Sequence, residues 1–158
     1  MNVFERCDRA ANSCYNRGLR LAKQRDLSGA VPYLKRALEL NKNLIEARNL
    51  LGLIFYEMGE VGDALVQWVI SIDLRTDNKR AVFYIDDVRR RGGQLESFAA
   101  MIERYNVALD AAQRGNYDLA IHQLARIVAQ HPNYVRAGLL LSLLYIEAGD
   151  YKRADHYL

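Results

Sequence analysis

The chain contains few of the residues that interrupt or cross-link a fold. Its 158 residues include only two prolines and two cysteines, and no stretch is dominated by one residue type or by glycine and serine. Such stretches are typical of disordered segments, so we expect a chain that is folded almost throughout. The length suits one compact structural unit, and we predict a single helical domain that spans 1–158.

Long apolar runs are also missing. No run approaches the roughly 18 residues that a membrane-spanning helix needs. The N-terminus, MNVFERCDRAANSCYNRG, interleaves charges where a signal peptide would have an apolar stretch. These two absences predict a cytoplasmic location with no membrane span.

The two cysteines are too far apart for a disulfide. Cys7 and Cys14 are seven residues apart, which on one helix corresponds to a rise of roughly 10 Å. We therefore interpret them as reduced thiols that serve as small residues on a buried helix face.

Motifs that carry catalysis or bind cofactors are absent as well. The sequence has no phosphate-binding loop, HExxH motif, paired CxxC or nucleophile elbow. His122 and His156 occupy equivalent repeat positions, but two histidines without a thiol or carboxylate make a poor metal site. Asp86 and Asp87 are adjacent, so on a helix they point to different sides and cannot share a proton. We expect no enzyme activity, no cofactor and no metal.

What the chain does contain is a repeat of 34 residues. Small residues recur at this period in the pairs Gly18 and Gly52, Ala30 and Ala64, Gly115 and Gly149, and Ala120 and Ala154. Each alanine is followed four residues later by a large apolar residue, in the pairs Ala30 and Leu34, Ala64 and Trp68, Ala120 and Leu124, and Ala154 and Leu158. Residues four apart share a helix face, so the small residue allows a paired helix to approach while the large one fills the remaining space.

The helices that precede these pairs have a matching apolar face. In one repeat the face consists of Leu50, Leu51, Ile54, Phe55 and Met58, and in the last repeat of Leu141, Leu144, Tyr145 and Ala148. Gly59, Gly115 and Gly149 end these helices, and Asn116 or Asp150 can cap the helix that follows. Such tight turns predict antiparallel helical hairpins.

This pattern resembles the tetratricopeptide repeat (TPR) family. The leucine, glycine and aromatic residue of the family signature appear as Leu51, Gly52 and Phe55, followed by Ala64 and Trp68 and, in another repeat, Pro132. The resemblance implies an all-α fold, a right-handed α-solenoid of antiparallel helical hairpins. It places the repeats at 11–44, 45–78 and 101–134, with a truncated repeat at 135–158. It also implies a non-catalytic scaffold that binds a protein or peptide partner.

The pattern is interrupted between Ala64 and Ala120, which lie 56 residues apart, or one period plus 22. We interpret 79–100 as an irregular helical insert, a helix that Gly92 and Gly93 end before the next helix begins. The insert either divides the stack into two subunits of two hairpins or is half of a degraded repeat.

Two further departures concern helix ends. Pro32 disfavours a helix interior, so we expect the helix that contains it to begin late, near Ser28. The chain stops about halfway through its last hairpin, where a solenoid would have a polar capping helix. We expect a fragment of a longer protein, with self-association through the uncapped C-terminal helix as a consequence.

The resemblance also indicates where a partner binds, because first helices of similar proteins line a concave groove. Carried onto this sequence, the groove residues are Asn12, Tyr15, Asn16, Leu19, Asn49, Leu53, Tyr56, Tyr105, Asn106, Leu109, Leu139 and Leu143. Tyr15 and Tyr105 are the strongest candidates, since tyrosine suits a surface with one apolar and one wet side. For each leucine, packing between neighbouring hairpins is an equally good interpretation.

The composition of these positions bears on the kind of partner. Chaperone-binding members use a lysine and arginine clamp, but the corresponding positions here hold Tyr15, Leu19, Leu50, Ile102 and Asn106. The pattern therefore argues against a carboxylate clamp. It favours an apolar peptide or an amphipathic helix.

An alternative function rests on charge. The net charge is +3, and the segment from Arg75 to Arg91 contains six basic and three acidic residues. Arg89, Arg90 and Arg91 could bind the phosphates of nucleic acid or an anionic membrane. No aromatic interleaving or second basic stripe supports this reading, and arginines at a helix C-terminus are already favoured by the helix dipole. A third alternative is a regulatory part of a larger multidomain protein.

Overall fold

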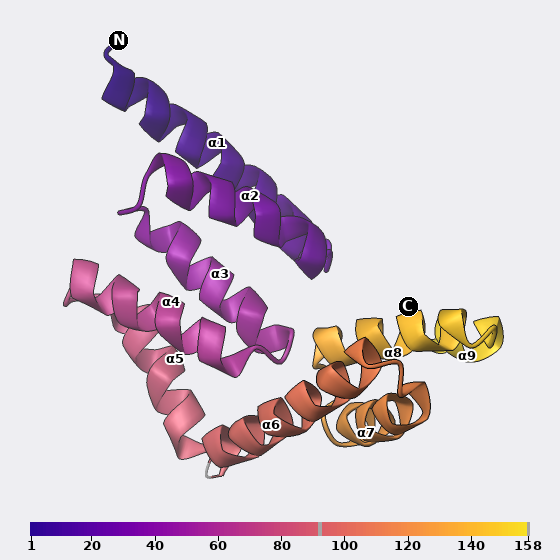
Figure 1. Cartoon of the computed structure of the whole chain (residues 1–158). Helices are drawn as coiled ribbons and strands as arrows, with labels where there is room; N and C mark the ends of the chain where they lie inside the picture. The colour runs from indigo at the N-terminus through magenta and orange to yellow at the C-terminus, as the bar shows by residue number, and fades with distance from the viewer. Residues whose placement is uncertain (92, 158) are drawn as a thin grey trace. The chain divides into compact units, whose positions relative to one another are not determined.

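The structure of the chain, a computed structural model, describes residues 1–91 and 93–157 (Figure 1). Over these ranges every regular element is an α-helix, which confirms the predicted all-α fold. The contacts divide the chain into two compact units, Met1–Arg91 and Gly92–Leu158. The sequence predicted one structural unit, and the division falls inside the segment 79–100 that we interpreted as an insert.

The first unit consists of two hairpins and one further helix. Its helices are α1 (Val3–Lys23), α2 (Leu27–Leu40), α3 (Ile45–Glu57), α4 (Val61–Leu74) and α5 (Lys79–Arg90). α1 packs mainly on α2 and α3 mainly on α4, while α5 packs on α4. The core of the two hairpins includes Leu34, Leu51 and Ile54, each at most 2% exposed.

The second unit has two hairpins of its own. They are α6 (Gln94–Gln113) with α7 (Tyr117–Gln130), and α8 (Val135–Glu147) with the short α9 (Tyr151–His156). The core includes Leu124, Ile127 and Leu141, all fully buried. α6 begins at Gln94, seven residues before the repeat start at 101 that the sequence predicted.

The small residues of the repeat bring paired helices into close contact. A Cβ atom added to Gly18 would lie 2.8 Å from Cγ of Leu34, and one added to Gly52 would lie 2.7 Å from Cδ1 of Trp68. Ala30, Ala64 and Ala120 are all completely buried. Close packing of Leu34 on Gly18 and of Trp68 on Gly52 therefore joins the helices of the two hairpins of the first unit. Leu158 lies outside the described residues.

The helix ends follow the predicted chemistry with one adjustment. Gly59, Gly115 and Gly149 have φ values of 80°, 80° and 76°, a left-handed conformation that costs glycine little. The side chain of Asn116 accepts a hydrogen bond from the Leu119 amide, and that of Asp150 from the Arg153 amide. α2 begins at Leu27, one residue before the predicted start, and runs through Pro32 without ending.

Candidate partner-binding groove

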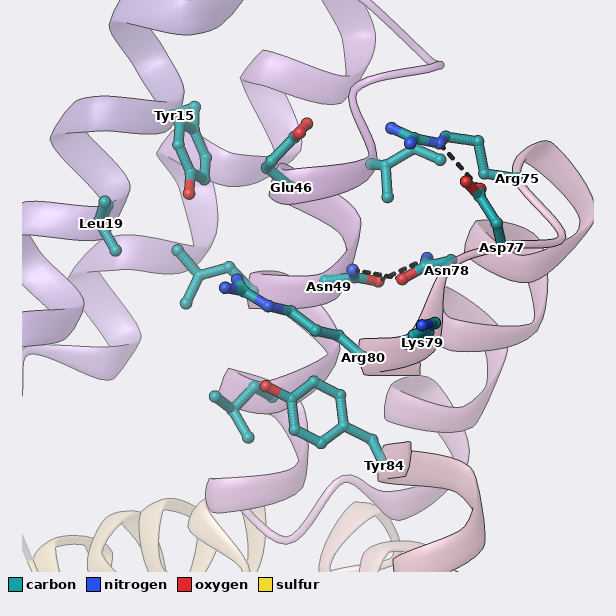
Figure 2. Close-up of a pocket in the computed structure, with 13 residues that line it drawn as sticks. Tyr15, Leu19, Glu46, Asn49, Arg75, Asp77, Asn78, Lys79, Arg80 and Tyr84 are labelled. Carbon is teal, nitrogen blue, oxygen red and sulfur yellow. Dashed lines mark hydrogen bonds and ion pairs between the residues drawn. The ribbon is translucent and has the colours of Figure 1, made fainter. Parts of the chain in front are cut away.

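The first unit contains a cavity of about 570 Å³ on the side of its first helices (Figure 2). α1 contributes Tyr15 and Leu19, and α3 contributes Asn49 and Leu53. These four residues were predicted to line a partner-binding groove, and the structure brings them to one cavity. α3 also contributes Ile45, Glu46 and Leu50, and the other lining residues, from Arg75 onward, come from the α4–α5 turn and from α5.

Sequence reasoning missed the contribution of α5. Arg80 and Tyr84 line the cavity, although both fall in the segment interpreted as an insert. The 34-residue period could have indicated this contribution, because α5 begins at 79, one period after the start of α3 at Ile45. This position agrees with the alternative that the segment is half of a degraded repeat, and α5 extends the lining formed by α1 and α3.

Arg80 is the central charged group of the cavity. Figure 2 shows its side chain extending across the cavity with Tyr15 on one side and Tyr84 on the other. Within the described residues Arg80 has no ion-pair or hydrogen-bond partner. Arg75, at the rim, differs because its Nε pairs with Asp77 at 3.2 Å. The guanidinium of Arg80 is thus available to a ligand.

The surroundings of Tyr15 shift the pKa of its phenol. Burial raises the pKa of Tyr15 above its ordinary value, the nearby carboxylate of Glu46 raises it further, and the cation of Arg80 lowers it. Tyr15 is therefore a neutral phenol at physiological pH, able to donate a hydrogen bond beside an arginine.

Asn49 has a structural task in addition to lining the cavity. Its Oδ1 accepts a hydrogen bond from Oγ of Ser71 at 2.7 Å, and its Nδ2 donates to Oδ1 of Asn78 at 3.1 Å. Nδ2 of Asn78 in turn donates to Oγ of Ser71 at 2.6 Å, while Oδ1 of Asn78 caps α5 by accepting from the Ala81 amide at 3.3 Å. This network joins α3, α4 and α5, and so it positions the helix that carries Arg80.

Trp68 is a buried residue that packs against Tyr84, one of the residues that line the cavity. It is 1% exposed, and its ring centroid lies 5.1 Å from that of Tyr84 and 6.0 Å from that of Tyr56. Tyr56, a predicted groove residue, packs on Trp68 and has the guanidinium carbon of Arg91 5.9 Å from its ring centroid; it does not line the cavity. Aromatic packing of this kind holds Tyr84 in place.

The other predicted groove residues are distributed elsewhere. Asn12 and Asn16 are exposed on α1 and line a separate shallow hollow. In the second unit, Tyr105 is partly buried against the core, with its ring edge-on to Tyr134 at 5.6 Å. Leu109 is half-buried and Asn106 exposed, while Leu139 and Leu143 are 48% and 58% exposed one turn apart on α8.

The three consecutive arginines do not form one patch. Arg91 pairs with Asp87, with Nη2 and Oδ2 3.1 Å apart. Arg89 lines a different cavity, between α4 and α5. Successive residues of a helix face different directions, so the predicted anion-binding surface from Arg89 to Arg91 has no common face.

The described residues contain neither a candidate metal site nor a membrane-spanning helix. No group of three or more histidine, cysteine, aspartate or glutamate residues within it could hold a metal ion. None of its described helices is long and apolar enough to cross a membrane.

Two models of the tetratricopeptide repeat match the chain, at residues 15–69 and 111–158. The chain belongs to the tetratricopeptide repeat family. The first match extends from the middle of α1 to the middle of α4, and the second covers most of the second unit. Tetratricopeptide repeats generally form protein–protein interaction scaffolds, and their presence supports a role of this kind for the chain.

The chain is also similar to solved structures. The TPR domain of P58(IPK) is 19% identical, with 93% of this chain and 39% of that chain covered and a TM-score of 0.52, which shows the shared fold. MamA is 22% identical over 94% of this chain and 87% of its own, with a TM-score of 0.44. YrrB, a TPR protein described as having an unusual peptide-binding site, is 16% identical over 99% and 89%, with a TM-score of 0.44. No curated protein matches the sequence of this chain.

Proposed function

We propose that the first unit of this TPR protein binds a segment of a partner protein in the groove formed by α1, α3 and α5. The segment carries an acidic residue that meets Arg80 and an apolar residue that packs on Leu19 and Leu53. The observation that supports this most directly is the guanidinium of Arg80, which has no intramolecular ion-pair or hydrogen-bond partner within the described residues and lies in a cavity between two tyrosines.

The chemistry of the lining residues favours such a segment. A guanidinium can form two parallel hydrogen bonds with one carboxylate, which gives orientation as well as affinity. Tyr15 and Tyr84 present an apolar ring and a hydroxyl, the combination that often anchors a bound peptide. The leucine side chains add an apolar wall, as predicted for a peptide or amphipathic-helix partner. The acidic residue of the partner segment was not expected from sequence, and we add it because Arg80 of α5 lines the cavity.

A peptide library tests this proposal. We expect random 12-residue peptides displayed on phage and selected on the full chain to become enriched in sequences that combine Asp or Glu with a large apolar residue. Selected peptides should bind Arg80→Glu at least about tenfold more weakly, the equivalent of one lost charge-assisted contact. Arg6→Glu, an exposed arginine outside the cavity, is the matched control and should bind like the parent.

Two outcomes would contradict the proposal. One is enrichment of peptides without acidic residues, and the other is equal affinity for the parent and Arg80→Glu. Circular dichroism of both variants checks that the fold is retained.

The remaining expectations from sequence stay predictions. They are the cytoplasmic location, self-association through the C-terminal helix, and membership of a larger multidomain protein. The ion pair of Arg91 with Asp87 and its contact with Tyr56 argue against nucleic-acid or membrane binding through Arg89, Arg90 and Arg91.

A further inference from the structure

A second hollow in the first unit lies between α4 and α5, and we call it the α4–α5 crevice. It is a cavity of about 260 Å³ lined by Val69, Ile72 and Asp73 from α4 and by Val82, Ile85, Asp86 and Arg89 from α5. Val69 is 54% exposed and Val82 is 40% exposed. These residues differ from those of the partner-binding groove, so the crevice is a separate surface.

The preceding repeat contains the equivalent crevice with different chemistry. A hollow between α2 and α3 is lined by Lys35, Leu38, Glu39, Arg48 and Leu51, together with Lys42 and Gln67. One period later these five positions are Val69, Ile72, Asp73, Val82 and Ile85, all in the α4–α5 crevice. Leu38, Glu39 and Leu51 correspond to residues of the same kind, whereas Lys35 and Arg48 correspond to valines.

In the preceding repeat the two cations make contacts. Nη1 of Arg48 donates to Oε1 of Gln67 on α4 at 3.1 Å, and Nζ of Lys35 lies 5.8 Å from the ring centroid of Phe55. α4, the second helix of the next hairpin, thus borders that crevice through Gln67. The later crevice thus has the apolar side chains of Val69 and Val82 at the two positions that Lys35 and Arg48 occupy in the earlier one.

α5 is the last helix of the first unit, so within this unit no second helix follows it to border the α4–α5 crevice. The period places such a helix after α5, with Met101 at the position of Gln67, but Met101 is 2% exposed in the core of the second unit. The close-approach residues are also lost. Asp86 occupies the position of Gly52, and Phe98 that of Ala64. A carboxylate and a large ring at these two points prevent the glycine-and-alanine contact of the regular hairpins.

We propose that the α4–α5 crevice binds an amphipathic α-helix of a partner protein, which packs as the second helix of the hairpin that α5 begins. Its apolar residues cover Val69, Val82 and Ile85, the burial of which is favourable. Its basic residue meets Asp86 at the point where Trp68 meets Gly52 in the preceding hairpin.

Charge complementarity identifies this occupant. Asp73 and Asp86 both line the crevice, and within the described residues neither has an ion-pair or hydrogen-bond partner. A helix that presents lysine or arginine beside an apolar stripe would satisfy both the acidic and the apolar part of the surface. An acidic helix would place its carboxylates beside Asp73 and Asp86, with only Arg89 of opposite charge in the lining, which is unfavourable.

The test uses two labelled peptides derived from α4 itself, since α4 borders the equivalent crevice. Both contain residues 61–74, constrained as a helix by a side-chain staple on the outer face. One carries W68K and the other W68E. In fluorescence anisotropy with the full chain, we expect the W68K peptide to bind and the W68E peptide to bind at least about tenfold more weakly.

Variants of the protein locate the binding. V69K/V82R introduces a lysine and an arginine like those of the preceding repeat, at positions that are already exposed. It should weaken binding of the W68K peptide by at least about tenfold. Val66→Lys, on α4 but outside the crevice, should bind normally. Arg80→Glu should also bind normally, so failure of this proposal and failure of the groove proposal are distinguishable.

Three results would overturn the proposal. The first is equal binding of the two peptides or none by either, and the second is equal binding by the parent and V69K/V82R. The third is a parent chain that sediments as a dimer and becomes a monomer in V69K/V82R, since the occupant would then be a second copy. Circular dichroism and the thermal midpoint of V69K/V82R establish that the variant is folded.

Discussion

Individual glycines of this chain have opposite effects according to what they touch. A Cβ atom at Gly52 would collide with Nε1 of the buried Trp68. A Cβ atom at Gly138, within α8, has as its nearest atom the backbone oxygen of Tyr157 at 3.8 Å, an ordinary contact. The first glycine is required by packing, whereas the second only adds conformational freedom to the unfolded chain.

Substitution by alanine should therefore change stability in opposite directions. We expect Gly52→Ala to lower the free energy of unfolding by about 1–3 kcal/mol, because the rigid indole cannot move away. Gly138→Ala should raise it by about 0.5–1 kcal/mol through helix propensity. Urea unfolding monitored by circular dichroism measures both effects, and a stabilised Gly52→Ala would show that Trp68 adapts.

Sequence reasoning worked at single residues where one period repeats the same packing. Ala64 and Trp68 were predicted from spacing alone and are buried as expected. The network of Asn49, Ser71 and Asn78 could not be predicted, because it depends on three side chains from different elements that no repeat position marks. Tyr105 illustrates the same limit, since its half-buried contact with Tyr134 depends on tertiary packing.

At the scale of elements, α2 tolerates a proline in its interior. Pro32 lacks the amide that would donate to the carbonyl of Ser28, yet α2 continues from Leu27 to Leu40. The helix is held by tertiary contacts instead, with Ala30, Leu34 and Ala37 fully buried on its inner face.

Pro32→Ala should consequently stabilise the first unit. Pro32 is exposed, so alanine adds the missing hydrogen bond without altering the core. The gain should be positive and no more than about 3 kcal/mol, the cost of proline in a helix interior. A higher urea midpoint in tryptophan fluorescence would establish it. A lower midpoint would mean that the proline ring itself contributes to packing.

The same scale explains why we interpreted 79–100 as an irregular insert, with half of a degraded repeat as one alternative. The period correctly marks where α5 begins, but Asp86 and Phe98 replace the glycine and alanine by which a hairpin is recognised. Ala64 and Ala120 are 56 residues apart, twelve fewer than two periods. α6, at 20 residues, is longer than α3 or α8, at 13 each, and it covers both the place of the missing second helix and the start of the next repeat.

At the scale of the whole molecule, each unit has a core of its own. The buried apolar residues of the first hairpins all lie before residue 91, and the larger second cluster comes entirely from Met101 onward. Cooperative unfolding follows from a shared core. Two separate cores predict that Met1–Arg91 and Gly92–Leu158 unfold in separate transitions.

The single tryptophan makes this prediction measurable, because Trp68 is the only one in the chain and is buried in the first unit. Its fluorescence reports the first unit, whereas far-ultraviolet circular dichroism reports helices of both. We expect the two probes to give different urea midpoints for the parent chain. Gly52→Ala should shift the fluorescence transition to lower urea, and Gly138→Ala should leave it unchanged while altering only the remaining dichroism change. Coincident transitions in the parent and in both variants would instead show that the two cores unfold as one cooperative structure.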